Sequence, residues 1–319
     1  MSGRGFDSQV YAVVWIVLYI VIMIPTIFGN ILILTSVRRF RALRSNMHIL
    51  IANLAVSDLI VGAVLVPLTL VGYFTGLKER NKYYCLTDIG VFVISLGSSC
   101  YNLLLISVER FIAIMFPLKS KVILTRKRLI ALIVFGWIDV TIVATLPLFG
   151  ITNYSDGSHC RLRKTWPRLY RSMTDSQMLI ILALNCICYT GVACVALKKS
   201  RVSMPATANM NTNVRKDFSH VLTMVIVLGL FILCWLPYVL IGGILLFKST
   251  PRLEFAQNCS VALGLLNSAM NWMIYGYRNK EFHRGFRRIL KLKKIPVPQG
   301  RSLRSYEVSV VNRNGMGRI

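Results

Sequence analysis

The sequence predicts an all-α protein, a bundle of seven membrane-spanning helices followed by a short amphipathic helix on the cytoplasmic side. Hydrophobic residues make up 55% of its 319 positions and charged residues only 16%, a balance that soluble domains seldom have. Seven apolar runs are long enough to cross a hydrocarbon core of roughly 30 Å as helices. They cover residues 11–36, 47–74, 83–114, 128–150, 176–197, 219–247 and 256–277. We therefore expect one membrane-spanning domain over 11–277, between a short N-terminal segment (1–10) and a tail (278–319).

The uneven distribution of basic residues predicts the orientation in the membrane. Of the 38 Lys and Arg residues, 27 lie in four segments that we assign to the cytoplasm: 37–45, 110–128, 198–217 and 278–319. The positive-inside rule then places the N-terminus outside the cell and the C-terminus in the cytoplasm, as an odd number of spans requires. The net charge of +26 flanks lipid-length spans, so we expect contact with membrane lipid and no nucleic-acid partner.

The first two spans each carry a polar residue at a depth where hydrocarbon is expected. The first ten residues are polar and we expect them to be unstructured. Asn30 in the first span needs a hydrogen-bond partner on a neighbouring helix. Asp58 in the second span is costly to expose to lipid, so it should face the bundle interior. Two interpretations stay open for Asp58: it binds an ion or a polar network, or it is protonated and holds helices together.

The third span joins a cysteine at one membrane face to a charge pair at the other. Cys85 and Arg110 are 25 residues apart, which corresponds to roughly 37 Å along a helix. A charged pair such as Glu109 and Arg110 should lie at an interface or face protein. The alternative is an arginine that only anchors the end of the helix by reaching toward the polar headgroups.

The fourth span and the outer loop that follows carry three features. Asp139 is an intramembrane acid to which the sequence assigns no partner. Asn153 begins an Asn-Tyr-Ser sequon, which predicts a glycosylated extracellular loop. Cys160 in this loop shares the oxidising side of the membrane with Cys85, so pairing is the natural interpretation, although sequence alone does not prove it. Most other cysteines lie within spans, where a free thiol behaves as a small hydrophobic group.

The fifth and sixth spans bring an aromatic and an acidic residue to the inner side. Tyr189 lies near the inner half of the fifth span. Pro237 lies within the sixth, where it removes a backbone hydrogen bond and should kink the helix. Asp217 precedes Pro237 by twenty residues, or about 30 Å of helix, so it reaches the cytoplasmic end near Arg110.

The last span and the segment after it are expected to differ in their relation to lipid. The seventh span contains several polar groups, including Asn267 and Asn271, that lipid would not favour. In the segment 279–292, Phe282 and Phe286 recur at helical spacing, with basic residues between them. This pattern predicts an amphipathic helix lying on the anionic inner leaflet.

Taken in chain order, these residues resemble the rhodopsin-like (class A) G-protein-coupled receptors, from the first span to the amphipathic helix. The matching motifs are Gly29-Asn30, Leu54…Asp58, Cys85 with Cys160, Glu109-Arg110-Phe111, Trp137, Cys234-Trp235-Leu236-Pro237 and Asn271…Tyr275. Each motif is weak alone, and their agreement in order carries the resemblance.

The resemblance implies a plasma-membrane receptor that binds an extracellular ligand and activates a heterotrimeric G protein by outward movement of the sixth span. It implies no enzymatic activity and no cofactor. The residues expected to form the coupling switch are Glu109, Arg110, Pro117, Tyr189, Asp217 and Tyr275. The resemblance also implies an allosteric sodium ion in a pocket formed by Asp58, Ser99, Asn267, Ser268 and Asn271. All five residues carry a side-chain oxygen, so none of them argues against the ion.

The chain departs from the family pattern at three places. Ile181 stands where the fifth span usually has proline, an absence shared with melanocortin, cannabinoid and lysophospholipid receptors. The chain therefore looks loosely like the branch that holds these and the adenosine receptors. Trp272 replaces the proline of the Asn-Pro-x-x-Tyr motif, which puts the family's inward swing of the seventh span in doubt. No cysteine follows the amphipathic helix, so palmitoyl anchoring is not expected there.

The resemblance also places a ligand pocket and narrows its ligand. The pocket residues are Phe92, Val93, Leu96, Trp235, Tyr238, Val239, Gln257 and Val261. Amine receptors of the family carry Asp at the position of Phe92, so we do not expect a monoamine. Asp88, one turn higher, is interpreted as loop-facing. An apolar cavity under a basic loop would suit an apolar or anionic amphiphile; equally open is that the loop arginines are only solvated.

Three rival functions are weaker. A retinal photoreceptor needs a lysine in the seventh span, and residues 256–277 contain none. A transporter or channel is the alternative from another class, but the spans show no internal repeat. An enzyme has no support in the sequence, since its four histidines have no metal-ligand spacing and no nucleophile elbow is present.

Overall fold

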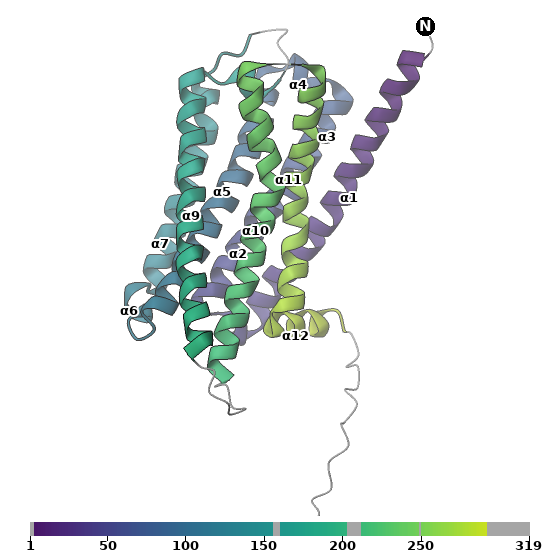
Figure 1. The fold of residues 1–319 in the computed structure, drawn as a ribbon. Helices are drawn as coiled ribbons and strands as arrows, with labels where there is room; N and C mark the ends of the chain where they lie inside the picture. Colours follow the sequence, from purple (N-terminus) through teal and green to yellow (C-terminus); the bar gives the residue numbers. More distant parts are fainter. Residues whose placement is uncertain (1–2, 156–159, 203–211, 249, 292–319) are drawn as a thin grey trace, which may run out of the picture.

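The computed structural model describes residues 3–155, 160–202, 212–248 and 250–291. Side chains at 3–12, 193, 196–202, 212–221, 224 and 246 are not described. Within these ranges all regular secondary structure is helical and no strand is present. Seven long helical segments lie roughly side by side (Figure 1). They are α1 (Gly3–Arg39), α2 with η2 and α3 (Asn46–Ile60, Val61–Leu65, Val66–Thr75), α5 (Lys82–Met115), α7 (Arg126–Thr145), α9 (Arg168–Val202), α10 (Thr212–Phe247) and α11 (Pro251–Arg278).

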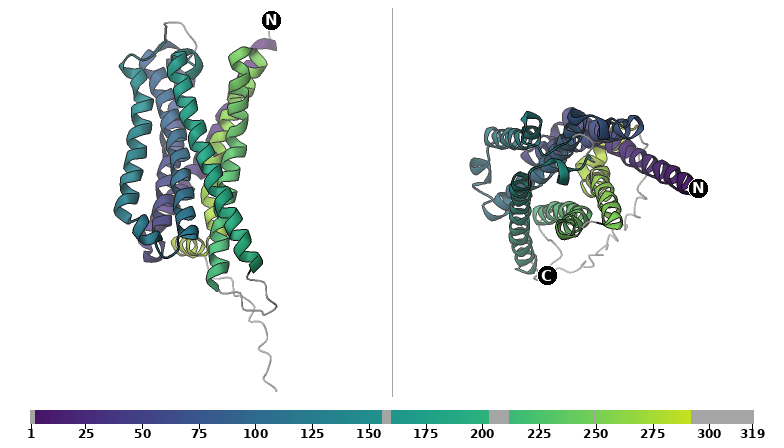
Figure 2. Two further views of the ribbon diagram at one scale, coloured as in Figure 1. Left: turned by 60° about the vertical axis from the view of Figure 1, so that its left-hand side comes forward. Right: turned by 90° about the horizontal axis from the view of Figure 1, so that it is seen from above.

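The seven predicted spans are confirmed, with corrections at their ends. Helix α1 begins at Gly3, so residues 3–10, which we expected to be unstructured, extend the helix outward. Helix α9 begins at Arg168, eight residues before the predicted run. The outer half of α1 diverges from the other helices (Figures 1 and 2).

Six of the described helical segments are both long and apolar enough to cross a membrane. The seventh, α11, has a sufficient length of 28 residues. Its composition is more polar because it contains Asn267, Ser268 and Asn271. All three side chains are buried in the bundle. A bundle interior can satisfy such groups at a depth where lipid could not.

The second span is interrupted by a π-helical turn, η2, between α2 and α3. Pro67 lies in the first turn of α3. Its ring has no N–H and crowds the carbonyl four residues earlier, and a π turn is one way for a helix to accommodate this. Asp58 lies three residues before η2, on the inner side of this irregularity.

Short elements join the long helices at both ends. The inner loops contain η1 (Arg41–Leu43) and α6 (Ser120–Ile123), and the outer side contains α4 (Leu77–Arg80), η3 (Leu146–Phe149) and α8 (Leu162–Thr165). Helix α12 (Lys280–Ile289) lies across the inner end of the bundle (Figure 1).

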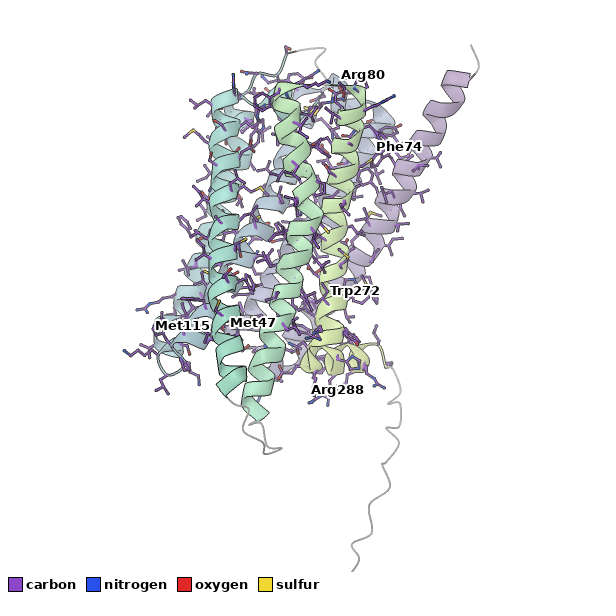
Figure 3. The ribbon with its side chains drawn as sticks, in the orientation of Figure 1. Met47, Phe74, Arg80, Met115, Trp272 and Arg288 are labelled. Atoms are coloured by element: carbon purple, nitrogen blue, oxygen red, sulfur yellow. A yellow bond between two sulfur atoms is a disulfide. The ribbon has the colours of Figure 1, made fainter. Side chains whose placement is uncertain are left out.

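Helix α12 is amphipathic, as the sequence predicts. Phe282 and Phe286 are buried against the bundle, whereas Arg284 and Arg288 are exposed (Figure 3). Asn279 caps the helix by accepting hydrogen bonds from the backbone N–H groups of Glu281 and Phe282. Such a helix can place cations at an anionic leaflet while its apolar face stays against protein.

Candidate signalling and ligand-binding sites

The inner end of α5 carries the predicted charge pair. Nη2 of Arg110 donates to Oε1 of Glu109 at 2.6 Å, and Nε of Arg110 donates to Oε2. The Arg110 side chain is 16% exposed and that of Glu109 11%, so the pair lies mostly within protein. The side chain of Asp217 lies outside the described ones, so its contact with Arg110 remains a prediction.

The other predicted switch residues surround this end of the bundle from different helices. Tyr189 of α9 and Tyr275 of α11 are both buried, and Tyr275 stacks on Phe282 of α12 with ring centroids 6.1 Å apart. Pro117 is exposed in the turn after α5, whose last residue is Met115 (Figure 3). The structure thus joins the foot of the bundle to the amphipathic helix through an aromatic contact.

Asp58 is fully buried in the middle of the bundle. Its Oδ2 accepts a hydrogen bond from Nδ2 of Asn271 at 2.9 Å. Its Oδ1, together with Oδ1 of Asn267 and Oδ1 of Asn271, is buried without a hydrogen-bond partner among the described residues. Buried acceptors seldom remain unsatisfied, and carboxylate and amide oxygens are the ligands that hard cations take. The donor set therefore fits a cation.

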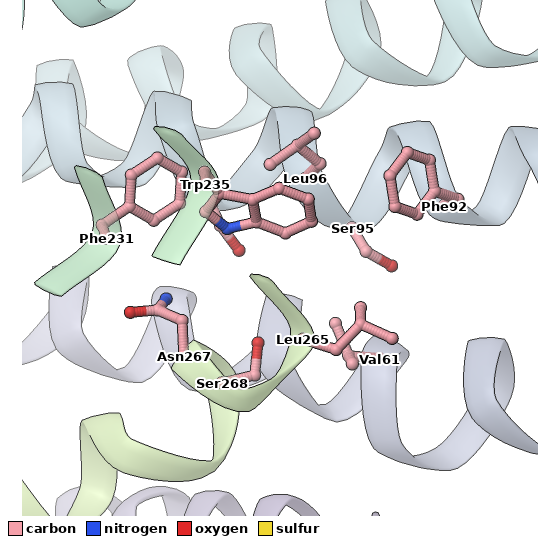
Figure 4. A pocket seen from close by; sticks show the side chains of 10 residues that line it. Val61, Phe92, Ser95, Leu96, Phe231, Trp235, Leu265, Asn267 and Ser268 are labelled. Atoms are coloured by element: carbon pink, nitrogen blue, oxygen red, sulfur yellow. The ribbon is translucent and has the colours of Figure 1, made fainter. Parts of the chain in front are cut away.

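A narrow cavity of about 10 Å³ lies beside these groups (Figure 4). That volume is about what one water-sized species needs. Three of the five predicted sodium residues, Ser99, Asn267 and Ser268, line the cavity. The other two, Asp58 and Asn271, are joined by their hydrogen bond.

Above this cavity, the predicted ligand pocket is filled by aromatic rings. The ring centroids of Phe92 and Trp235 are 5.9 Å apart, those of Phe92 and Tyr238 5.9 Å, and those of Trp235 and Tyr238 5.8 Å. Phe92, Leu96 and Trp235 also line the cavity (Figure 4). Nε2 of Gln257 donates to the backbone carbonyl of Tyr238 at 3.3 Å. These contacts close the floor of the pocket in this conformation.

The remaining residues of the predicted pocket lie in different parts of the bundle. Val93 packs in the cluster around the disulfide, Val261 packs with α1 and η2, and Val239 is half-buried on α10. The structure therefore brings together the aromatic members and Leu96, and separates Val93 from Val261.

Asp88 faces the outer loop, as we interpreted it, and is buried there. It is 4% exposed and accepts a hydrogen bond from Oγ1 of Thr69 at 2.9 Å. Nζ of Lys78 lies 2.5 Å from its Oδ2. Lys78 is in α4, whose position beside the outer end of α5 the sequence did not reveal. The lysine neutralises the acid, so Asp88 is engaged within the chain.

The outer loop is attached to the bundle at several points. Cys85 and Cys160 form the predicted disulfide. The backbone N–H of Cys160 donates to Glu79 at 3.0 Å, and Arg161 forms an ion pair with Glu254 of α11 at 2.6 Å. Asn153, the first residue of the sequon, is exposed. The loop arginines are thus not all free in solvent.

Arg163 of this loop lies close to Arg171 in the first turn of α9. Nη1 of Arg171 donates to the backbone carbonyl of Arg163 at 2.8 Å. Burial and the guanidinium of Arg171 lower the pKa of Arg163, against the opposing effect of Glu254. Both cations therefore lie close together at the outer end of the bundle.

We expect Cys85→Ser or Cys160→Ser to destabilise the protein by about 4 kcal/mol, because the bond closes a segment of 75 residues. The measurement is the thermal unfolding midpoint of the purified protein. Cys259→Ser removes an exposed free thiol on the outer side and should leave the midpoint unchanged. Equal midpoints for all variants would show that the disulfide does not stabilise the fold.

Sequence reasoning missed a polar network that connects α2, α5 and α7. Nε1 of Trp137 donates to Oδ1 of Asn53 at 3.0 Å, and Nδ2 of Asn53 donates to Oδ1 of Asn102. Nδ2 of Asn102 in turn donates to Oγ of Ser57 at 3.1 Å. The available signal was the presence of Asn102 inside an apolar span, where an amide needs a partner.

A second missed contact concerns Asp139, to which the sequence assigned no partner. Nε2 of Gln177 in α9 donates to its Oδ2 at 2.6 Å. The two residues are separated by 38 positions in the chain. No spacing rule connects them, and only the packing of α7 beside α9 does.

Comparison with known proteins agrees with this architecture. Residues 29–275 match the family model described as "7 transmembrane receptor (rhodopsin family)". The chain is 28% identical over 304 residues to the alpha-1A adrenergic receptor of Oryctolagus cuniculus and 27% identical over 305 residues to that of Rattus norvegicus. Each alignment covers 84% of this chain, and the chain spans 65% of the length of these relatives. The chain belongs to the rhodopsin family of seven-transmembrane receptors.

Proposed function

We propose that this protein is a cell-membrane receptor that binds an extracellular ligand and activates a heterotrimeric G protein. Its N-terminus would be extracellular and its C-terminus cytoplasmic, in keeping with the basic inner loops. The observation that most supports the proposal is the mostly buried pair of Glu109 and Arg110 at the inner end of α5. A charge pair held there is available to a partner once the helices around it separate.

The proposed activation step is an outward movement of α10 with Pro237 as its pivot. In the resting state Arg110 would pair with Glu109 and also reach Asp217 at the inner end of α10. An ion pair at such an interface contributes only about 1 kcal/mol. That amount corresponds to a change of roughly fivefold in a two-state population.

For the ligand we propose a compound other than a monoamine, with an apolar or anionic amphiphile as the best fit. The relatives are adrenergic receptors by name. In this chain, however, the position of the amine-binding acid is occupied by Phe92, whose ring contacts Trp235 and Tyr238. Arg163 and Arg171 at the outer end supply positive charge, and an apolar floor lies beneath them.

We further propose that Asp58, Ser99, Asn267, Ser268 and Asn271 hold a sodium ion that favours the resting state. The buried oxygens without hydrogen-bond partners support this assignment. A ligand shifts a two-state equilibrium only through its differential affinity for the two states. Sodium should therefore weaken agonist binding if the pocket narrows on activation.

We expect sodium chloride to lower basal nucleotide exchange in the wild type, relative to potassium chloride at equal ionic strength. Asp58→Asn should lose this difference, because the amide has no charge to attract the ion. The measurement is nucleotide exchange by a G protein with purified receptor. If basal exchange by the wild type were the same in both salts, the sodium assignment would be wrong. A protonated Asp58 that holds helices together would then be the alternative.

Two assays separate the proposed function from the alternative, a transporter or channel. A receptor should accelerate guanine-nucleotide exchange when a panel of lipid, nucleoside and peptide ligands is applied to membranes with G protein. A transporter should instead move a panel compound into sealed vesicles without any G protein. Uptake with no exchange response would overturn the receptor proposal.

A further inference from the structure

A second hollow lies on the outside of the bundle, between α5, α7 and α9. Its volume is about 640 Å³, in the range of small-molecule sites. Phe135 of α7 and Ile180 of α9, each 60% exposed, form part of its wall. Because exposed apolar residues of a membrane helix face lipid, this hollow opens into the bilayer. We call it the lateral groove.

Asp139 is the acid in the wall of the lateral groove. It lies ten residues before the end of η3 and Gln177 nine residues after the start of α9. Each is therefore roughly 15 Å below the outer end of its helix. An ionisable group at this depth is costly and calls for a partner. Gln177 supplies one hydrogen bond, but none of the ion pairs among the described side chains includes Asp139.

The groove changes in polarity along the membrane normal. Ser172 and Ser176 line it on the outer side of Gln177, whereas Ile181 and Leu184 line it deeper in the membrane. Helix α9 runs inward through this region, so the polar groups lie toward the outer surface and the apolar groups toward the bilayer centre. That order matches an amphiphile of the outer leaflet, with its polar head outward and its chain inward.

We propose that the lateral groove binds a long-chain amine from the outer leaflet, whose ammonium group pairs with Asp139. An alkyl ammonium stays protonated at neutral pH, as a lysine side chain does. It would supply the positive charge that the described wall of the groove lacks, since no lysine or arginine lines it. The alkyl chain would cover Tyr101, Phe135 and Leu184, and the serines would take further polar groups of the head.

The test measures binding of dodecylamine to the full-length receptor in nanodiscs of phosphatidylcholine, without G protein. We expect dodecylamine to raise the thermal unfolding midpoint, whereas dodecanol and dodecanoate at the same concentration should not. Asp139→Asn keeps an acceptor for Gln177 but removes the charge, so its affinity for the amine should fall at least about tenfold, or 1.4 kcal/mol.

Two further variants test the proposal even if Asp139→Asn does not fold. Ile180→Trp should fill the groove and block the amine, whereas Val134→Trp, at an exposed position of α7 outside the groove wall and on another face of the helix from Phe135 and Asp139, should leave it unaffected. Equal binding of amine and alcohol, or binding insensitive to both Asp139→Asn and Ile180→Trp, would overturn the proposal in favour of nonspecific lipid contact. Because the readout needs no signalling, a failed receptor proposal would not affect it.

Discussion

Arg110→Ala is expected to reduce ligand-stimulated nucleotide exchange to the level seen without receptor, while ligand binding persists. The guanidinium lies at the inner end of α5 in a mostly buried pair with Glu109, at the opposite end from the aromatic floor of the ligand pocket. Removing it takes away the group that would meet the G protein but leaves that floor unchanged. The measurement is exchange by purified G protein, with radioligand or thermal-shift binding in parallel.

The matched control is Arg126→Ala, which removes an exposed cation from the inner end of α7. We expect it to retain exchange, because a surface charge contributes little. Asp217→Ala should act in the opposite direction and raise basal exchange roughly fivefold, by loss of about 1 kcal/mol of restraint. Full signalling by Arg110→Ala at equal surface expression would exclude the arginine from coupling.

Gly29→Ala is expected to destabilise the receptor by about 1–3 kcal/mol or more, the cost of forcing extra volume into a packed interior. A Cβ atom at Gly29 would lie 1.9 Å from two ring atoms of Trp272, far inside any permitted contact. The indole also contacts Phe28 of α1 edge to face, with ring centroids 5.7 Å apart. The measurement is the thermal unfolding midpoint of purified receptor.

Gly229→Ala is the matched control, since its Cβ would meet no atom within 4 Å. Replacing a helical glycine there should leave stability unchanged or raise it by up to about 1 kcal/mol. The double variant Gly29→Ala with Trp272→Ala should recover part of the loss, because the ring that clashes is gone. A Gly29→Ala receptor as stable as the Gly229→Ala receptor would mean that the indole moves aside at no cost.

The contact between Gly29 and Trp272 also explains the departure in the seventh span. Where the family has proline, α11 is one helix from Pro251 to Arg278, and the indole of Trp272 lies on α1 instead (Figure 3). Nearby, Nδ2 of Asn30 donates to the backbone carbonyl of Ser268 at 3.2 Å. The inner halves of α1 and α11 are therefore joined by both packing and hydrogen bonding.

The sequence by itself determined the number of spans and the amphipathic helix, whereas the Cys85–Cys160 disulfide was its natural interpretation and was confirmed by the structure. It could do so because the length of an apolar run and the spacing of Phe282 and Phe286 are properties of one segment. The pairing of Glu109 with Arg110 was also within reach, since the two are neighbours in the chain.

Tertiary structure alone decided several of the contacts between polar residues of different helices. Asp88 with Lys78, Asp139 with Gln177, and Trp137 with Asn53 join residues on different helices. Their contacts depend on the rotation of each helix about its axis and on which helices are neighbours. Both are set by the packing of whole helix surfaces against one another, and a hydropathy pattern read along one segment does not contain that information.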